Sequence, residues 1–182
     1  MKRLLYLVLL AITSPGCVTL PVSPDNLARL SAKTPPLNVP LKVQESQDYC
    51  GIAAVEMVAA YYQKPVSDAG YQRLRSRVPI TDGTTGADMQ TAFKDAGYFV
   101  ALFTGALDES SAGLLHHLDA HRPLIVMLGA GSARHYLVVT GYDQAQGVLF
   151  VNDPAGYKLA IKYDYFMQHW SASNRFTLLA VP

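Results

Sequence analysis

Apolar positions in the first half of the chain recur at helical spacing. Across residues 50–62 they return every three or four positions, so that one stripe holds Ala54, Val55, Val58, Tyr61 and Tyr62. Asp48 or Tyr49 stands where the N-cap is expected, and Pro65 ends the pattern, because the residue before a proline disfavours helical backbone. The pattern therefore predicts a helix that begins at Cys50.

Two further helices are predicted before the strand-rich part of the chain. The first opens on residues 84–88 and stops at Gly97, a residue type that ends helices by adopting left-handed backbone. The second runs from Asp108, a favourable cap, to Ala120, with Pro123 just beyond it. Together the three segments predict a helical N-terminal half.

The second half of the chain changes to short runs rich in β-branched and aromatic residues. Five such runs are separated by Gly-rich or Asp-Pro turns: residues 124–128, 136–140, 148–151, 157–161 and 176–181. A tail segment before the last run, residues 165–170, is expected to be helical. Helices followed by consecutive strands predict an α+β fold with an antiparallel sheet.

The N-terminus predicts export and lipid attachment. A short basic start precedes nine apolar residues, a length that suits a signal peptide and is too short to cross a bilayer. Residues 13–17 then resemble a bacterial lipobox, in which the cysteine is acylated with diacylglycerol and becomes the new N-terminus, although Ser14 stands where leucine is usual. We therefore expect residues 1–17 to be a lipoprotein signal peptide and lipobox, with Cys17 as the lipidated residue.

A proline-rich stretch, residues 18–39, follows the lipobox and is typical of an extended tether. Regular periodic segments begin after it, so residues 40–182 are assigned to one folded domain. Half of the residues in the chain are apolar, which at this length suits a single domain with one substantial core.

The charge balance excludes one class of partner. The 15 basic residues become 13 once Lys2 and Arg3 are removed, against 14 acidic residues, so the exported part is near neutral and does not attract nucleic acid. The expected partners are a peptide or protein substrate and a membrane, to which the lipid would anchor the protein. Val18 after the lipidated cysteine resembles the sorting signal for the outer membrane, so we expect a place in the bacterial cell envelope facing the periplasm. The sequence is silent on oligomeric state.

Cys50 carries the most specific candidate chemistry. If Cys17 is acylated, Cys50 is the one cysteine left, and an unpaired cysteine in an exported protein suggests a reactive thiol or an intermolecular partner. A thiol reacts as its thiolate, a form that a helix N-terminus or a nearby imidazolium favours. Two ordinary explanations stay open: a small buried apolar side chain, and a disulfide with Cys17 after signal cleavage further upstream.

Five histidines compete to stand beside this thiol. His116, His117 and His121 fall on or just after the predicted third helix, where a surface or capping role is expected. His169 lies in the helical tail among aromatic residues. His135 differs because it heads a predicted strand directly after a Gly-rich loop, and a strand end is a rigid platform for a catalytic group. A histidine hydrogen-bonded at a strand start explains that position equally well.

Asp153 and Gln44 complete the candidate set. Asp153 lies at the end of the following strand and would return beside His135 if the two strands pair through a turn at residues 141–143. There it would orient the imidazole and stabilise its charged form, although an aspartate before proline is also a common turn former. Gln44 offers a side-chain amide to the oxyanion that develops on an attacked carbonyl. Taken singly, each residue has a structural explanation that is as good.

Ordered blocks along the chain carry a family resemblance. They are Gln44 with Tyr49-Cys50-Gly51, Gly83 to Tyr98, residues 122–126, residues 135–143, residues 152–154, and Phe166 with Trp170. In this order they resemble the bacteriocin-processing, double-glycine leader peptidases and their stand-alone relatives, which are papain-like cysteine peptidases. The similarity is collinear from about residue 39 to the C-terminus, so it covers essentially the whole predicted domain.

The resemblance implies a papain-like fold and roles for four residues. Cys50 is the nucleophile, His135 the general base and later acid, Asp153 the orienting carboxylate, and Gln44 the oxyanion donor. Such a protein would be a membrane-anchored cysteine peptidase that hydrolyses a bond in a peptide or protein, with leader peptides as one candidate substrate. The chemistry implied needs no metal or organic cofactor.

The chain departs from the family pattern in two places. Ile52 stands where many stand-alone relatives have proline after Cys-Gly, which changes the first helical turn and removes no catalytic group. Gln47 also lies near the cysteine, so Gln44 as the oxyanion donor depends on its six-residue spacing.

Three alternatives bear on function. The best-known relatives are fused to ATP-driven exporters, whereas these residues contain no transporter segment or nucleotide-binding motif, so cleavage of double-glycine leaders is not carried over. Acyl transfer to an amine is a related reaction that the same residues would support. The runner-up function is a non-catalytic peptide-binding module of an envelope or export assembly.

Overall fold

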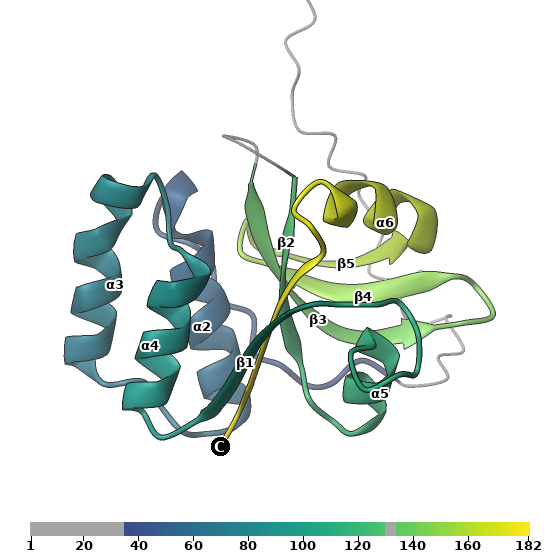
Figure 1. Ribbon diagram of the computed structural model, residues 1–182, viewed down its shortest axis with the longest axis horizontal. Coiled ribbons are helices and arrows are strands. Elements are labelled where there is room, and N and C mark those ends of the chain that lie inside the picture. Colours follow the sequence, from purple (N-terminus) through teal and green to yellow (C-terminus); the bar gives the residue numbers. More distant parts are fainter. Residues whose placement is uncertain (1–34, 130–133) are drawn as a thin grey trace, which may run out of the picture.

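The computed structural model describes residues 35–129 and 134–182 (Figure 1). The predicted signal peptide, Cys17 and most of the predicted tether lie outside the described residues. Within the described residues, no helix combines the length and the apolar character needed to cross a membrane.

Three helices lie side by side in the N-terminal half (Figure 1). A 3-10 turn, η1 (Gln47–Tyr49), leads into α2 (Cys50–Tyr61), which is buried along most of its length because it is apolar on nearly all sides. The next two helices are α3 (Asp68–Thr81) and α4 (Gly86–Asp95). Each begins where a side-chain oxygen, of Ser67 or Thr85, accepts a hydrogen bond from a first-turn backbone N–H.

The second half forms one six-stranded sheet in which all neighbouring strands are antiparallel, in the order β1-β6-β2-β3-β4-β5. Helices α2 and α4 pack on β3 and β1. The short helices α5 (Leu114–Asp119) and α6 (Tyr163–Ser171) both contact β2, and they also contact β3 and β5, respectively. Helices followed by an antiparallel sheet confirm the predicted α+β class. The strands are β1 (Phe99–Thr104), β2 (Leu124–Leu128), β3 (His135–Asp143), β4 (Val148–Asp153), β5 (Tyr157–Lys162) and β6 (Phe176–Val181).

Apolar side chains cover both faces of this sheet. Along β3, Val138 belongs to the cluster that contains the buried residues of α2 and α4, whereas Val139 belongs to the cluster with α5 and α6. This is the alternation expected for neighbouring residues of a strand. The first cluster joins the helical half to the sheet, so the start of α2 is held against the start of β3.

The chain joins the folded domain before residue 40. Val39 is fully buried, and its backbone oxygen accepts a hydrogen bond from Asn152 Nδ2 in β4 (2.9 Å). The backbone N–H of Leu37 donates to the backbone oxygen of Thr140 in β3 (2.7 Å). The last residues assigned to the tether therefore pack on the sheet, because their apolar side chains contact its core.

The observed elements differ from the predicted ones in the middle of the chain. The sequence pattern does not predict α3 or β1. The third predicted helix begins at Leu114 instead of Asp108, because Asp108 Oδ1 accepts hydrogen bonds from the backbone N–H (3.0 Å) and hydroxyl (2.6 Å) of Ser110 and closes a turn. The predicted turn at residues 141–143 lies inside β3, and the chain reverses at residues 144–147.

Candidate active site

Cys50 is the first residue of α2, and its thiol is free and only 7% exposed. The residue before it, Tyr49, makes no side-chain hydrogen bond to the first turn of the helix. The first-turn N–H groups therefore point toward the start of α2 without a side-chain cap. This end of a helix carries partial positive charge, which favours a thiolate.

Gly51 lets another loop approach the cysteine closely. A Cβ atom on Gly51 would lie 2.6 Å from Cβ of Thr84, in the loop between α3 and α4. That distance is shorter than two carbon atoms tolerate, so a larger residue would push this loop and the start of α2 apart. The glycine that follows the cysteine thus has a packing role.

His135 and Asp153 meet because β3 and β4 are paired. The register sets Val138 opposite Asn152, which brings the start of β3 to the end of β4. His135 Nε2 donates to Asp153 Oδ1 at 2.7 Å, and the same oxygen accepts the backbone N–H of Ala155 at 2.8 Å. The carboxylate therefore closes the turn after β4 and also contacts the imidazole, so the two explanations offered for Asp153 occur together.

The Cys50 side chain also lies close enough to His135 to affect the pKa of its ring. Because Nε2 is bonded to Asp153, Nδ1 is the ring nitrogen that remains for the thiol. Burial disfavours the imidazolium, but hydrogen bonds and charges from Asp153 and Cys50 outweigh this and raise the pKa of His135 from 6.5 to about 10. The His135 ring is therefore held in its charged form beside the Cys50 side chain at neutral pH.

Gln44 is hydrogen-bonded to the residue that follows Asp153. Its backbone N–H donates to the oxygen of Pro154 (2.8 Å), directly after Asp153. Its side chain is half-buried, and Nε2 donates to the backbone oxygen of Gln47 (3.1 Å), whereas the Gln47 side chain is exposed. An amide nitrogen carries two N–H bonds, so one remains for a ligand. Gln47 thus orients the Gln44 amide through its carbonyl.

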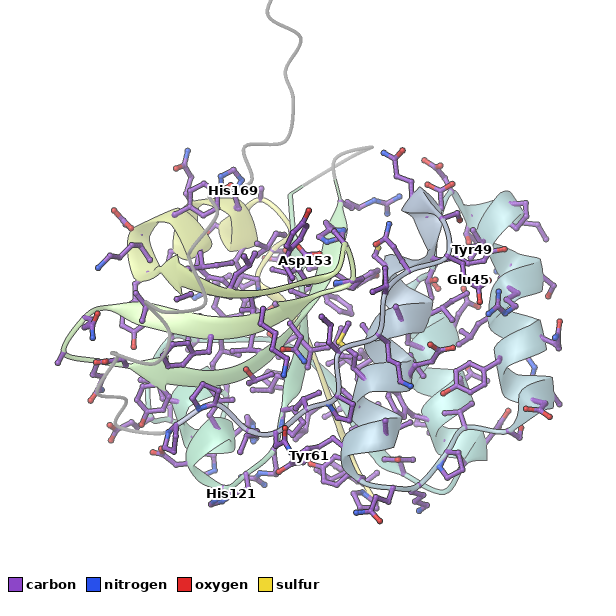
Figure 2. The ribbon with its side chains drawn as sticks, turned by 180° about the vertical axis from the view of Figure 1, so that it is seen from behind. Glu45, Tyr49, Tyr61, His121, Asp153 and His169 are labelled. Atoms are coloured by element: carbon purple, nitrogen blue, oxygen red, sulfur yellow. The ribbon has the colours of Figure 1, made fainter. Side chains whose placement is uncertain are left out.

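The other histidines lie elsewhere. Figure 2 shows Asp153 where the sheet meets the helical half and His121 at the other end of the molecule. His121 and His116 are exposed, and the His169 ring packs on Tyr165, with ring centroids 4.3 Å apart. Among the described residues, no His, Cys, Asp and Glu side chains gather in a group that could hold a metal.

His117 corrects one expectation. It was expected at the surface or in a cap, yet it is 6% exposed and its ring lies 5.8 Å from that of Phe103. Burial, together with the positive charge of Arg122, lowers the pKa of His117 to about 4. His117 is therefore a neutral, buried residue that packs beside Phe103.

The nucleophile candidate at a helix start, with histidine and aspartate on neighbouring antiparallel strands, defines the papain-like cysteine peptidase architecture. The chain belongs to the peptidase C39-like family, whose model matches residues 36–177. No curated protein matches the chain by sequence at a significant level. The family agrees with the resemblance read from the sequence.

Solved structures share this fold. The peptidase domain of Streptococcus ComA, a bi-functional ABC transporter involved in quorum sensing, is 23% identical, with 78% of this chain and 97% of that chain covered and a TM-score of 0.62. A double glycine motif protease from an AMS/PCAT transporter, solved with the leader peptide, is 20% identical, with 81% and 94% covered and a TM-score of 0.59. A candidate C39-like peptidase from Bacillus anthracis is 16% identical, with 80% and 95% covered and a TM-score of 0.62.

The sequence did not predict the contact between α3 and the segment from Gln44 to Cys50. Arg75 of α3 contacts Glu45 and Tyr49 in this segment. Because α3 is largely polar, its apolar pattern is weak. The available signals were Ser67 as a helix cap and two later buried positions four residues apart, Leu74 and Val78.

Proposed function

We propose that this chain is a cysteine peptidase that hydrolyses peptide bonds, with Cys50 as the nucleophile, His135 as the general base and acid, and Asp153 as the orienting carboxylate. The observations that carry the proposal are the hydrogen bond between His135 and Asp153 and the influence of the Cys50 side chain, at the start of α2, on the pKa of the same imidazole. Membership of the peptidase C39-like family supports the reaction type.

Acylation is the first half of the reaction. The reaction starts from a pair in which the proton of the Cys50 thiol has passed to His135, and the thiolate forms a bond to the substrate carbonyl carbon. The carbonyl oxygen gains negative charge, which the backbone N–H of Cys50 and the second N–H of Gln44 Nε2 stabilise. The C–N bond then breaks, and the imidazolium gives its proton to the departing amine. An acyl thioester on Cys50 remains.

Deacylation restores the enzyme. His135, neutral after acylation, takes a proton from water as the water oxygen attacks the thioester carbonyl. The same two donors stabilise the second oxyanion, and the C–S bond breaks. Cys50 leaves as a thiolate beside the imidazolium, so the starting pair is regenerated. Asp153 keeps the ring oriented throughout, because its own position is fixed by Ala155.

The proposed substrate is a peptide or an exposed segment of a protein. One structure of similar fold was solved with a leader peptide bound, which supports a peptide ligand for this fold. We propose, in addition, that the domain works at the bacterial outer membrane, facing the periplasm and held by a lipid on Cys17. The lipobox-like segment in the sequence supports this location.

Labelling with a thiol-directed peptidyl electrophile tests the proposal. The protein should react at Cys50 at neutral pH and cleave members of a peptide library, while Cys50→Ala should do neither. His135→Ala should lower the rate of peptide cleavage by roughly 100-fold or more, because the general base is lost.

Two outcomes would contradict the enzyme. One is the absence of labelling in a folded sample, and the other is labelling that His135→Ala leaves undiminished. Library peptides that bind without being cleaved would instead favour the non-catalytic peptide-binding module.

A further inference from the structure

Arg75 of α3 makes two contacts with the segment that leads into α2. Its Nη1 and Nη2 donate to the two carboxylate oxygens of Glu45 at 2.5 and 2.6 Å. The guanidinium carbon also lies 5.4 Å from the centre of the Tyr49 ring, within the range of a cation–π contact. Figure 2 shows Glu45 and Tyr49 next to each other on this side of the molecule.

The two partners of Arg75 lie at the two ends of one short segment. Glu45 follows Gln44, which carries the proposed side-chain oxyanion donor, and Tyr49 precedes Cys50, which carries the backbone donor. Both donors must point at one oxygen atom for the oxyanion to be stabilised. A single side chain that holds both neighbours therefore sets the distance between the two donors.

The inner side of this segment is already fixed. The Gln44 backbone N–H is bonded to Pro154, and the Gln44 amide is bonded to the carbonyl of Gln47 within η1. Neither bond restrains the side of the segment that faces α3, toward which the Glu45 side chain points. The guanidinium supplies that restraint, and its planar fork fixes a direction as well as a distance.

The ion pair between Arg75 and Glu45 is better explained by a role in positioning the segment than by a contribution to the stability of the fold. The Arg75 side chain is 28% exposed and that of Glu45 63% exposed, and ion pairs so exposed contribute little to the free energy of unfolding. A second pair on the same helix, Arg73 with Asp95, has a single contact at 2.5 Å and touches no part of the site. It provides a matched control.

We propose that Arg75 is a positioning residue that aligns the oxyanion donors of Gln44 and Cys50 by holding Glu45 and Tyr49. The inference rests on the proposed function and extends it to a residue outside the contact chain of Cys50, His135 and Asp153. Arg75 does not touch the reacting atoms. It acts through the segment.

Two thiol reagents separate alignment of the donors from formation of the thiolate. With p-nitrophenyl acetate, sulfur bonds to the acetyl carbon, negative charge develops on the carbonyl oxygen, and p-nitrophenolate leaves. With iodoacetamide, sulfur displaces iodide from a saturated carbon, and no oxyanion forms. The ratio of the acylation rate to the alkylation rate therefore reports the oxyanion site alone.

The expected result is a selective loss of acylation. In Arg75→Gln, acylation should slow about 10-fold while alkylation changes less than about 2-fold, because misplacement costs less than loss of a donor. Gln44→Ala should slow acylation roughly 100-fold. Glu45→Gln should resemble Arg75→Gln, Arg75→Lys should fall between it and the unchanged protein, and Arg73→Gln should leave the ratio unchanged.

The outcomes that overturn the inference are distinct from those that overturn the proposed function. If Gln44→Ala lowers the ratio but neither Arg75→Gln nor Glu45→Gln does, Arg75 has no positioning role. If Gln44→Ala also leaves the ratio unchanged, the oxyanion donor is wrongly assigned and the inference about Arg75 falls with it, whereas the proposed function is overturned only by the Cys50 and His135 results given above. Should Arg75→Gln fail to fold, as judged by circular dichroism, Glu45→Gln and Arg75→Lys decide the matter.

Discussion

Asp153 combines a structural and a chemical task in one oxygen atom. Its Oδ1 accepts the backbone N–H of Ala155 and the ring N–H of His135. The first bond fixes the carboxylate after β4, and the second uses that fixed group to hold the ring. A turn-forming aspartate next to a paired strand is thus already placed to orient a histidine.

Replacing this carboxylate should change the pH dependence of the reaction. The pKa of His135 is raised to about 10, so kcat/KM for a cleavable peptide should fall as the pH rises through that value and the imidazolium is lost. In Asp153→Asn the amide still accepts hydrogen bonds, but the negative charge is gone. The alkaline limb should therefore move down by about 1–3 pH units. An unmoved limb would mean that Asp153 does not set the charge of the ring.

Stability should follow the same linkage. The folded-state pKa of His135 lies above its ordinary value of 6.5, so the interaction contributes fully to the free energy of unfolding below pH 6.5 and is lost as the pH rises to about 10. The difference in unfolding free energy between the unchanged protein and Asp153→Asn should therefore shrink across this window. Urea titrations at several pH values measure it.

At the residue scale, the sequence names the candidates but does not show their contacts. Cys50, His135 and Asp153 are found from residue type, position in a predicted element and order along the chain. The choice between Gln44 and Gln47 requires the backbone path, because it depends on which side chain is half-buried and which carbonyl orients it. The burial of His117 was likewise hidden, since a six-residue helix has too few positions to reveal its buried face.

The helix α2 depends on a close contact at its first turn. Gly51 is pressed against Thr84, with 2.6 Å between the Cβ that Gly51 lacks and the Cβ of Thr84. A helix that begins with the nucleophile is therefore fitted to the loop before α4 as well as to the sheet. The contact explains why a small residue follows the cysteine in this chain.

A methyl group at this contact should destabilise the domain. Gly51→Ala should lower the free energy of unfolding by about 1–3 kcal/mol, because Thr84 or the helix must shift to avoid overlap. Thr84→Gly removes the opposing Cβ, so the double variant should lose less stability than the two single changes added together. Thr84→Ala keeps that Cβ, so its double variant with Gly51→Ala should show no such relief. Thermal or urea unfolding measures all five variants, and strictly additive losses for Gly51→Ala with Thr84→Gly would refute the packing argument.

Helices and strands are predicted correctly where their apolar positions follow a clear period. They are missed or misplaced where polar residues dominate the segment or form a turn. α2, α4 and most strands were predicted within a few residues, because their apolar positions follow one period. α3 was missed since its buried face is narrow, with Gly70, Leu74 and Val78 as its buried residues. The third predicted helix starts too early, at Asp108 instead of Leu114, because the Asp108 side chain accepts a hydrogen bond within a turn and does not cap a helix.

The whole molecule brings together parts from both ends of the domain. Gln44 comes from the segment before α2, whereas His135 and Asp153 come from the sheet, and the bond from Gln44 to Pro154 joins the two halves. The order of helices and strands predicted this α+β arrangement. It did not predict the position of β6 between β1 and β2, because such a crossover leaves no local mark in the sequence.

The proposed anchor makes a prediction for the complete chain. In a bacterial host, the unchanged protein should sediment with membranes, and Cys17→Ser should move most of it to the soluble fraction because acylation is lost. Cys50→Ser is the matched control, since it should remain with membranes while it loses reaction with thiol electrophiles. Fractionation followed by immunoblotting measures both. A Cys17→Ser variant that fractionates like the unchanged protein would refute the lipid anchor.

The buried Val39 also has a mechanical consequence. A chain held at a surface by its N-terminus transmits tension along the backbone toward Gln44. Before that tension reaches Gln44, it meets the bond from Leu37 to Thr140, the side chain of Val39 in the core and the bond from Asn152 to Val39. These contacts bear the tension before it reaches Gln44. Pulling on the N-terminus should therefore leave the geometry between Gln44 and Cys50 undisturbed until Val39 is drawn out of the core.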